Sequence, residues 1–132
     1  MIIRDTQIES FIAANESELV TAVCEALIRT DRERTAGIRP LRLLSIAKIG
    51  IAKAREAGFS RPEDLAVYVA LMLHISPDFA EHPAIAAVLG DTNFPLSERL
   101  RQLAERVPDA AWDEAEAKYD PQFWIKESAA EG

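Results

Sequence analysis

The sequence has one cysteine among its 132 residues, Cys24, which excludes an internal disulfide and any metal site built from several cysteines. It also lacks an apolar run of the roughly 20 residues that a membrane-spanning helix needs. The longest near-continuous apolar run extends only from Leu65 to Ile75. The first residues, MIIRDTQIE, contain no basic region followed by an apolar segment, so no signal peptide is predicted. These absences favour a cytoplasmic protein with no membrane segment.

Catalytic motifs are absent as well. The sequence contains no G-x-S-x-G turn for a nucleophilic serine, no phosphate-binding P-loop and no dinucleotide-binding glycine motif. The only cluster of metal-ligand residue types is His74, Asp78, Glu81 and His82. Pro77 interrupts this cluster, so helical spacing does not bring the four side chains together, and the end of a helix is the better interpretation. We therefore predict no catalytic residue, no cofactor, no metal, and a protein that is not an enzyme.

The composition is that of one compact domain, with 48% hydrophobic and 28% charged residues. Apolar residues recur at helical spacing, and no segment shows the alternation of a strand. The pattern predicts an all-α bundle of about six or seven helices in a single domain, residues 1–120, followed by a C-terminal tail, residues 121–132. The predicted helices cover about residues 6–14, 15–28, 40–57, 60–75, 84–89, 95–107 and 109–119. Residues 30–38 are predicted to be an exposed connection. At Asn15 the chain either breaks into the first two helices or only bends within one long helix.

The segment 60–75 predicts a central helix around which the others pack. Ser60 and Glu63 have the S-x-x-E spacing of a capping box, which favours a helix start at Ser60. Between Leu65 and Ile75 only His74 is strongly polar. A helix without a polar face is expected to be buried on all sides.

Two glycines give further predictions about the helix over residues 40–57, one within it and one directly after it. Gly50 lies inside that helix, where glycine costs roughly 1 kcal/mol relative to alanine, and close approach of a neighbouring helix is the expected reason. Gly58 is expected to end the helix in the left-handed conformation, with Phe59 packing back on the last turn.

Basic residues are concentrated between residues 29 and 55, although the whole chain has a net charge of −7. Arg32, Arg34, Arg39 and Arg42 would form a positive face that attracts charged partners. Alternatively, charges of opposite sign neutralise each other within the fold. Phosphate contacts with nucleic acid are a third possibility, but the acidic remainder of the chain would repel a duplex.

Large aromatic side chains gather near the C-terminus, at Trp112, Tyr119, Phe123 and Trp124. Partly exposed, they would form a protein-binding hot spot, because Trp and Tyr bury a large area at modest entropic cost. Packed against the bundle, they would only form a lid over its core. The sequence leaves both alternatives open.

A distinctive set of residues is spaced along the chain between residues 2 and 107. Its members are Ile3, Arg4, Gln7, Gly50-Ile51, Ala54, Gly58-Phe59-Ser60, Pro62-Glu63-Asp64, Tyr68-Val69, Leu71-Met72, Pro77-Asp78-Phe79, Pro83, Arg99 and Leu103. This set resembles a group of small all-helical bacterial proteins that accompany type VI secretion effectors. Residues 108–132 lie outside the resemblance.

The resemblance implies a non-enzymatic accessory protein that binds another protein. It would be a chaperone or adaptor that loads or stabilises a toxic effector, or a cognate immunity protein that neutralises it. The expected partner is accordingly a toxic effector, a spike protein or an adaptor protein. The alternative from a different class is a small helical regulator that binds nucleic acid through residues 29–55.

Overall fold

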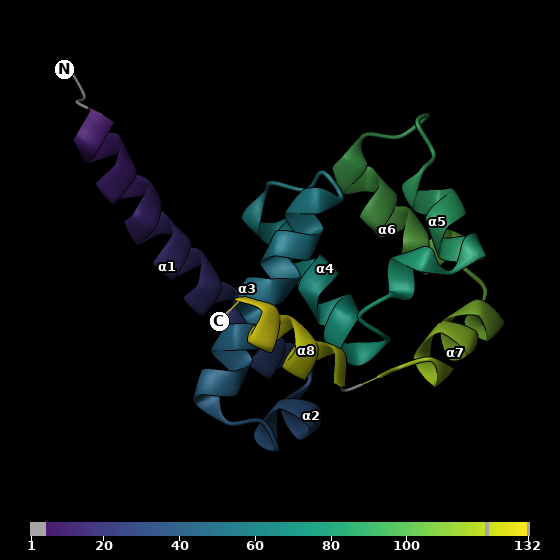
Figure 1. Ribbon diagram of the computed structural model, residues 1–132. Helices are drawn as coiled ribbons and strands as arrows, with labels where there is room; N and C mark the ends of the chain where they lie inside the picture. Colours follow the sequence, from purple (N-terminus) through teal and green to yellow (C-terminus); the bar gives the residue numbers. More distant parts are fainter. Residues whose placement is uncertain (1–4, 121, 132) are drawn as a thin grey trace.

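The computed structural model describes residues 5–120 and 122–131, with side chains described for residues 16–120 and 122–126. Across these residues the protein is all-α and contains no strand (Figure 1). The elements are α1 (Asp5–Thr30), α2 (Arg32–Ala36), α3 (Pro40–Glu56), α4 (Pro62–His74), the 3-10 helix η1 (Phe79–Glu81), α5 (Pro83–Leu89), α6 (Leu96–Arg106), α7 (Asp109–Ala117) and α8 (Gln122–Glu131).

Helix α4 lies in the middle of the bundle, where it packs against α1, α3 and α6 (Figure 1). Leu65, Val69 and Met72 have no exposed surface. Burying a side chain of this size contributes about 1.5–3 kcal/mol each. The predicted all-α bundle around a central helix is therefore confirmed.

The start and the exposure of α4 differ from the predictions. Arg61, not Ser60, occupies the N-cap position, and Pro62 is the first helical residue. Proline suits this position because its missing N–H would have no partner within the helix. In addition, Val67 is 46% exposed. The expectations of a capping box at Ser60 and of burial on all sides are therefore wrong.

Gly50 lies where α3 and α4 approach each other closely. A Cβ atom at this position would lie 2.7 Å from both γ-carbons of Val69, well inside contact distance. The glycine thus allows the two helices to pack together, as its position in the sequence predicted.

Gly58 ends α3 with a φ of +102°. The N–H of Phe59 donates to the carbonyl of Ala54 at 3.1 Å, and the N–H of Gly58 donates to the carbonyl of Arg55 at 2.9 Å. These two bonds form a Schellman motif, and Phe59 is buried behind it. The predicted left-handed helix end is confirmed.

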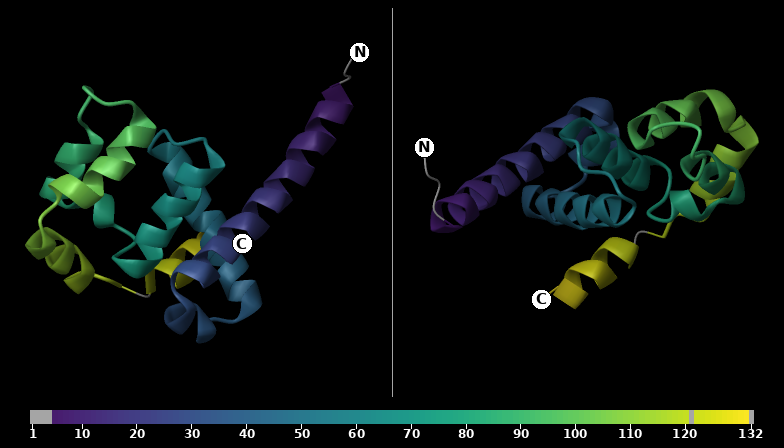
Figure 2. Two further views of the ribbon diagram at one scale, coloured as in Figure 1. Left: turned by 180° about the vertical axis from the view of Figure 1, so that it is seen from behind. Right: turned by 90° about the horizontal axis from the view of Figure 1, so that it is seen from above.

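Helix α1 is continuous over 26 residues, so Asn15 does not break it. Its first half extends away from the bundle, and its second half packs against α3 and α4 (Figure 2). Val23 and Leu27 in this second half are each 1% exposed. The C-terminal half of α1 is therefore the part that contributes to the core.

Residues 30–38, predicted to be an exposed connection, contain the short helix α2, and of these residues only Thr35 is buried. The carboxylate of Asp31 accepts a hydrogen bond from the N–H of Arg34 at 3.1 Å, which caps this short helix. The hydroxyl of Thr35 donates to the carbonyl of Asp31 at 2.8 Å, and Thr35 is buried. A single turn of helix has no apolar stripe, so the capping aspartate was the only local signal for it.

The elements η1, α5, α6 and α7 form a second group of helices beside α4 (Figure 1). Phe79 of η1 is fully buried, with its ring centroid 5.0 Å from that of Tyr68 in α4. Leu100, Leu103 and Val107 form a buried apolar stripe along α6 and the residue directly after it. The aromatic contact and this stripe attach the second group to the central helix.

The segment 121–132 was predicted to be a tail, yet its described residues form helix α8. This helix crosses back from the end of α7 to pack against α3 (Figure 1). Its anchor is Trp124, which is 4% exposed. The chain end is therefore joined to the bundle through a contact that lies more than 60 residues away in the sequence.

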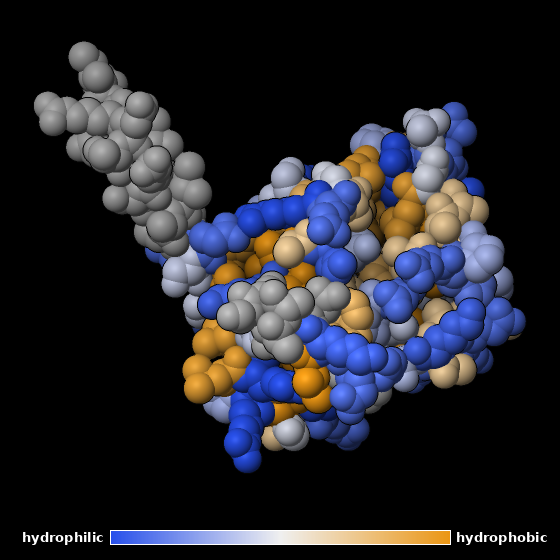
Figure 3. All heavy atoms as spheres, viewed as in Figure 1, coloured by the Kyte–Doolittle hydropathy of each residue, from blue (hydrophilic) through white to orange (hydrophobic). Residues whose placement is uncertain are grey.

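None of the helices in the described part of the chain combines the length and the apolar character needed to cross a membrane. The surface over α3 and α8 mixes apolar and hydrophilic patches (Figure 3). Leu41 at the start of α3 is 81% exposed.

Candidate functional site

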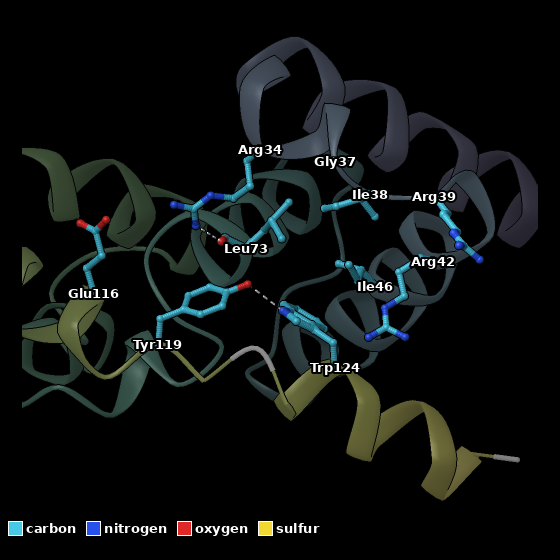
Figure 4. A pocket seen from close by; sticks show the side chains of 10 residues that line it. All are labelled: Arg34, Gly37, Ile38, Arg39, Arg42, Ile46, Leu73, Glu116, Tyr119 and Trp124. Carbon is cyan, nitrogen blue, oxygen red and sulfur yellow. Dashed lines mark hydrogen bonds between the residues drawn. The ribbon is translucent and has the colours of Figure 1, made fainter.

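An open groove of about 820 Å³ lies where α2, α3, α4, α7 and α8 meet (Figure 4). It brings together five of the eight candidate site residues predicted from the sequence. Three belong to the basic segment and two to the C-terminal aromatic residues. The five are Arg34, Arg39, Arg42, Tyr119 and Trp124. The two candidate surfaces are thus one site.

Arg34 is held inside the fold by several contacts. Its Nη1 donates to the carbonyls of Leu73 at 2.6 Å and His74 at 3.0 Å, which are at the C-terminal end of α4. Its Nε lies 3.6 Å from the carboxylate of Asp31, and its guanidinium lies over the ring of Tyr119 at 5.6 Å. Arg34 therefore joins α2, α4 and the end of α7, and its charge is largely used within the protein.

Asp31 completes this network. Nδ1 of His74 lies 3.1 Å from its carboxylate. The hydrogen bond with His74, together with the N–H of Arg34, lowers the pKa of Asp31 below its ordinary value. The carboxylate is therefore stabilised in its charged form, which caps α2 and holds Arg34 in place.

Arg39 and Arg42 have a different environment. Both side chains are exposed, and neither pairs with a carboxylate among the described residues. They lie at one end of the groove, and Glu116 lies at the other (Figure 4). The groove is therefore basic at its α3 end and acidic at its α7 end.

Tyr119 and Trp124 form an aromatic wall between these two ends (Figure 4). The Nε1–H of Trp124 donates to the hydroxyl of Tyr119 at 2.9 Å. Phe123 packs edge-on against Trp124, with ring centroids 5.2 Å apart. Because Tyr119 is half-buried, its ring is available to a ligand in the groove, whereas Trp124 mainly attaches α8 to α3.

The other three predicted site residues lie elsewhere. Arg32 lines a separate, largely apolar groove of about 490 Å³ between α1, α2 and α3. Phe123 faces a small hollow beside η1, and Trp112 is half-buried against the core. The structure does not bring these three residues to the site.

Several groove residues had no functional signal in the sequence, namely Gly37, Ile38, Ile46, Leu73 and Glu116. Ile46 and Leu73 belong to the apolar stripes of their helices and are each 3% exposed. Their place at the bottom of the groove follows from tertiary packing, which helical spacing alone does not specify.

The two histidines among the candidate metal ligands are engaged with other groups. His74 pairs with Asp31, while Nε2 of His82 lies 2.8 Å from the carboxylate of Glu114. Nδ1 of His82 accepts the N–H of Ala84 and so caps α5. Among the described side chains, no group of three or more His, Cys, Asp or Glu residues is placed to hold a metal ion.

Cys24 lies in the core. Its thiol is 3.7 Å from the carbonyl of Leu43, and burial raises its pKa. A raised pKa disfavours the reactive thiolate.

No family model matches the chain, and no curated protein or solved structure is significantly similar to it. The relation to the type VI accessory group therefore stays a prediction from the sequence.

Proposed function

We propose that the chain is a non-enzymatic accessory protein that acts in the cytoplasm by binding another protein in this groove. The observation that carries the proposal is the combination of two exposed arginines, which pair with no described carboxylate, and a half-buried tyrosine around an apolar floor. Arginine, tyrosine and tryptophan are the residues most enriched at the energetic centres of protein interfaces.

The chemistry of the groove supports binding more than catalysis. Its described lining contains one carboxylate, Glu116, and no histidine, cysteine or serine. A nucleophile with an adjacent base is the usual requirement for covalent catalysis. The lining residues therefore favour recognition of a ligand over its chemical conversion.

The proposed partner comes from the sequence resemblance alone. It is a toxic effector, a spike protein or an adaptor of a type VI secretion cluster, and the chain would be its chaperone, its adaptor or its immunity protein. The groove is compatible with each of these roles because all of them require a specific protein contact.

Nucleic acid binding through residues 29–55 gains no support from the arrangement of the bases. Arg34 is used within the fold, and Arg55 forms a bidentate pair with Glu16 at 2.6 and 2.8 Å. Arg32 lines a different groove from Arg39 and Arg42. A backbone-tracking site needs a continuous positive path, which these residues do not supply.

Co-purification tests the proposal. The full chain, immobilised, is expected to retain a toxic effector, spike or adaptor protein encoded beside it, and Tyr119→Ala is expected to weaken that retention. Val67→Ala, which truncates an exposed apolar residue on α4, is the matched control. Failure of all three partner classes to bind would show that the proposal is wrong.

Rescue experiments separate the proposed roles. An immunity protein protects a cell that makes the toxin alone, whereas a chaperone or adaptor raises the level or the export of the effector. Both readouts use the same Tyr119→Ala variant, so each role is tied to the groove.

A further inference from the structure

We infer that the groove binds a short acidic segment of the partner, with carboxylates paired to Arg39 and Arg42 and an apolar side chain against Tyr119. The inference rests on the proposed protein-binding function and adds the chemical class of the bound segment.

The basic end of the groove is at the start of α3. Arg39 is the N-cap residue of this helix and makes no side-chain capping hydrogen bond, and the first turn of α3 contains no acidic residue. Ser, Thr, Asp and Asn are preferred at an N-cap, and the helix dipole favours negative charge there. Two arginines at this position thus oppose the local preference of the helix.

Such conflicts with local preference are expected where a residue serves function. No described carboxylate offsets the two charges, although the chain as a whole is acidic. A carboxylate from a partner would relieve the conflict, because it would pair with the guanidinium groups and interact favourably with the helix N-terminus. The basic end is therefore complementary to an acidic ligand.

Arg34 does not share this role. Its guanidinium is engaged by the carbonyls of Leu73 and His74 and lies over Tyr119. It positions the tyrosine ring at the side of the groove. The carboxylates of the ligand are accordingly assigned to Arg39 and Arg42 only.

The middle of the groove is suited to an apolar side chain. Ile46 and Leu73 lie at its floor and are almost fully buried, and Tyr119 contributes a half-buried ring. An apolar side chain placed here would exclude water from the arginine–carboxylate pairs beside it, which strengthens them. The bound segment therefore needs an apolar residue next to its acidic ones.

The acidic α7 end of the groove would repel a long negatively charged ligand. Glu116 lines that end, and the exposed acids Asp109 and Asp113 lie on the same helix, with Asp120 just after it. A polyanion such as a nucleic acid carries a charge at every phosphate and would meet these carboxylates. A short peptide with its acids at one end avoids them.

Fluorescence titration of the full chain tests the inference. The chain has two tryptophans, so Trp112→Phe leaves Trp124, in the wall of the groove, as the only indole reporter. The probes are short synthetic peptides in which glutamates precede one leucine, matched peptides with glutamine in place of glutamate, and single-stranded oligothymidylate. The glutamate peptides are expected to bind, and to bind more weakly as salt is raised.

The variant Arg39→Asp/Arg42→Glu is expected to lower the affinity of the glutamate peptides more than about tenfold, because two favourable pairs become repulsive. Arg32→Asp makes the same type of charge change at an exposed arginine outside the groove, and it is expected to change the affinity less than about twofold. The thermal midpoint of the double variant should equal or exceed that of the wild type, since both substitutions suit a helix N-terminus.

Three outcomes would overturn the inference: glutamine peptides that bind as tightly as glutamate peptides, oligothymidylate that binds in preference to both, or no binding of any glutamate peptide. If a protein partner still co-purifies equally with wild type and the double variant, the acidic segment is wrong while the protein-binding function stands. If no partner co-purifies, the proposed function itself fails.

Discussion

At the scale of single residues, Arg34 and Arg39 illustrate how neighbours in one basic segment acquire different roles. Arg34 lies within α2 and reaches the end of α4, which comes about 40 residues later. Arg39 starts α3 and faces solvent. The same residue type is therefore a structural link in one case and a candidate ligand contact in the other.

Arg34→Ala is expected to destabilise the protein by about 1–3 kcal/mol, because two carbonyls at the end of α4 lose their donor and Tyr119 loses its cation contact. Urea denaturation measures this loss. Arg34→Lys should recover only part of it, since a lysine lacks both the Nε that lies beside Asp31 and the planar guanidinium that lies over Tyr119. Arg42→Ala is the control, expected to change stability by less than about 0.5 kcal/mol; equal stability of all variants would contradict the assigned role.

Gly50→Ala is also expected to destabilise the protein, although alanine is the better helix former by roughly 1 kcal/mol. The added Cβ would lie 2.7 Å from the γ-carbons of Val69, and overpacking of this kind costs about 1–3 kcal/mol.

A double-mutant cycle checks this contact. Val69→Ala removes both γ-carbons, so Gly50→Ala should cost less in that background than in the wild type. If the two substitutions have additive effects on the free energy of unfolding in chemical denaturation, contact with Val69 is not the reason that position 50 requires glycine.

At the scale of elements, α8 shows the largest difference from the sequence prediction. Its apolar residues Phe123, Trp124 and Ile125 are consecutive, so they give no helical stripe. The structure nevertheless buries Trp124 against α3 and leaves Ile125 42% exposed. Among the described side chains of α8, Trp124 is the buried anchor, and Phe123 packs partly buried against the core.

Trp124→Ala is accordingly expected to lower stability by about 3 kcal/mol, the lower end of the range for a buried aromatic residue. Ile125→Ala, on the same helix but exposed, should change it by less than about 0.5 kcal/mol. Thermal unfolding followed by circular dichroism distinguishes the two. If Trp124→Ala lowers stability as little as Ile125→Ala does, the packing of α8 on α3 contributes little to the stability of the protein.

At the scale of the whole molecule, several pairs of charged or titratable side chains join separate parts of the chain, and in three of these pairs the pKa of the carboxyl group is lowered. These three are Glu16 with Arg55, Asp31 with His74 and Asp91 with Arg106. In each case the partner lowers the pKa of the carboxyl group, mainly through a hydrogen bond to its charged form. The folded state therefore binds protons to these groups less readily than the unfolded state does.

The stabilisation from these carboxylates is fully present above their ordinary pKa values, near pH 4, and is lost as the pH falls through the lower folded values. We expect stability to be level between about pH 5 and 7 with respect to these groups and to fall below about pH 4. Urea denaturation at a series of pH values measures this. Replacing Glu16 with Gln, Asp31 with Asn and Asp91 with Asn should make the acid dependence shallower, and an unchanged slope would exclude these pairs as its cause.

The sequence by itself determined the features that depend on near neighbours. Helical periodicity fixed the all-α class, and the central helix and the stripe of α6 follow from the same periodicity. The glycine at position 58 fixed the end of α3, because only a residue without a Cβ readily takes its backbone conformation. The close approach at Gly50 was predicted for a different reason: a glycine inside a helix lowers its stability, and close packing of a neighbouring helix explains why it is tolerated.

Tertiary structure decided the groove. Its sides come from residues 34 to 46, from Leu73 and from residues 116 to 124, and no local rule relates such distant segments. The sequence indicated the basic and the aromatic residues separately, but only the packing of α8 on α3 and the reach of Arg34 to α4 placed them around one hollow. A helix pattern specifies which face is buried, whereas the partner that covers it depends on contacts between segments far apart in the chain.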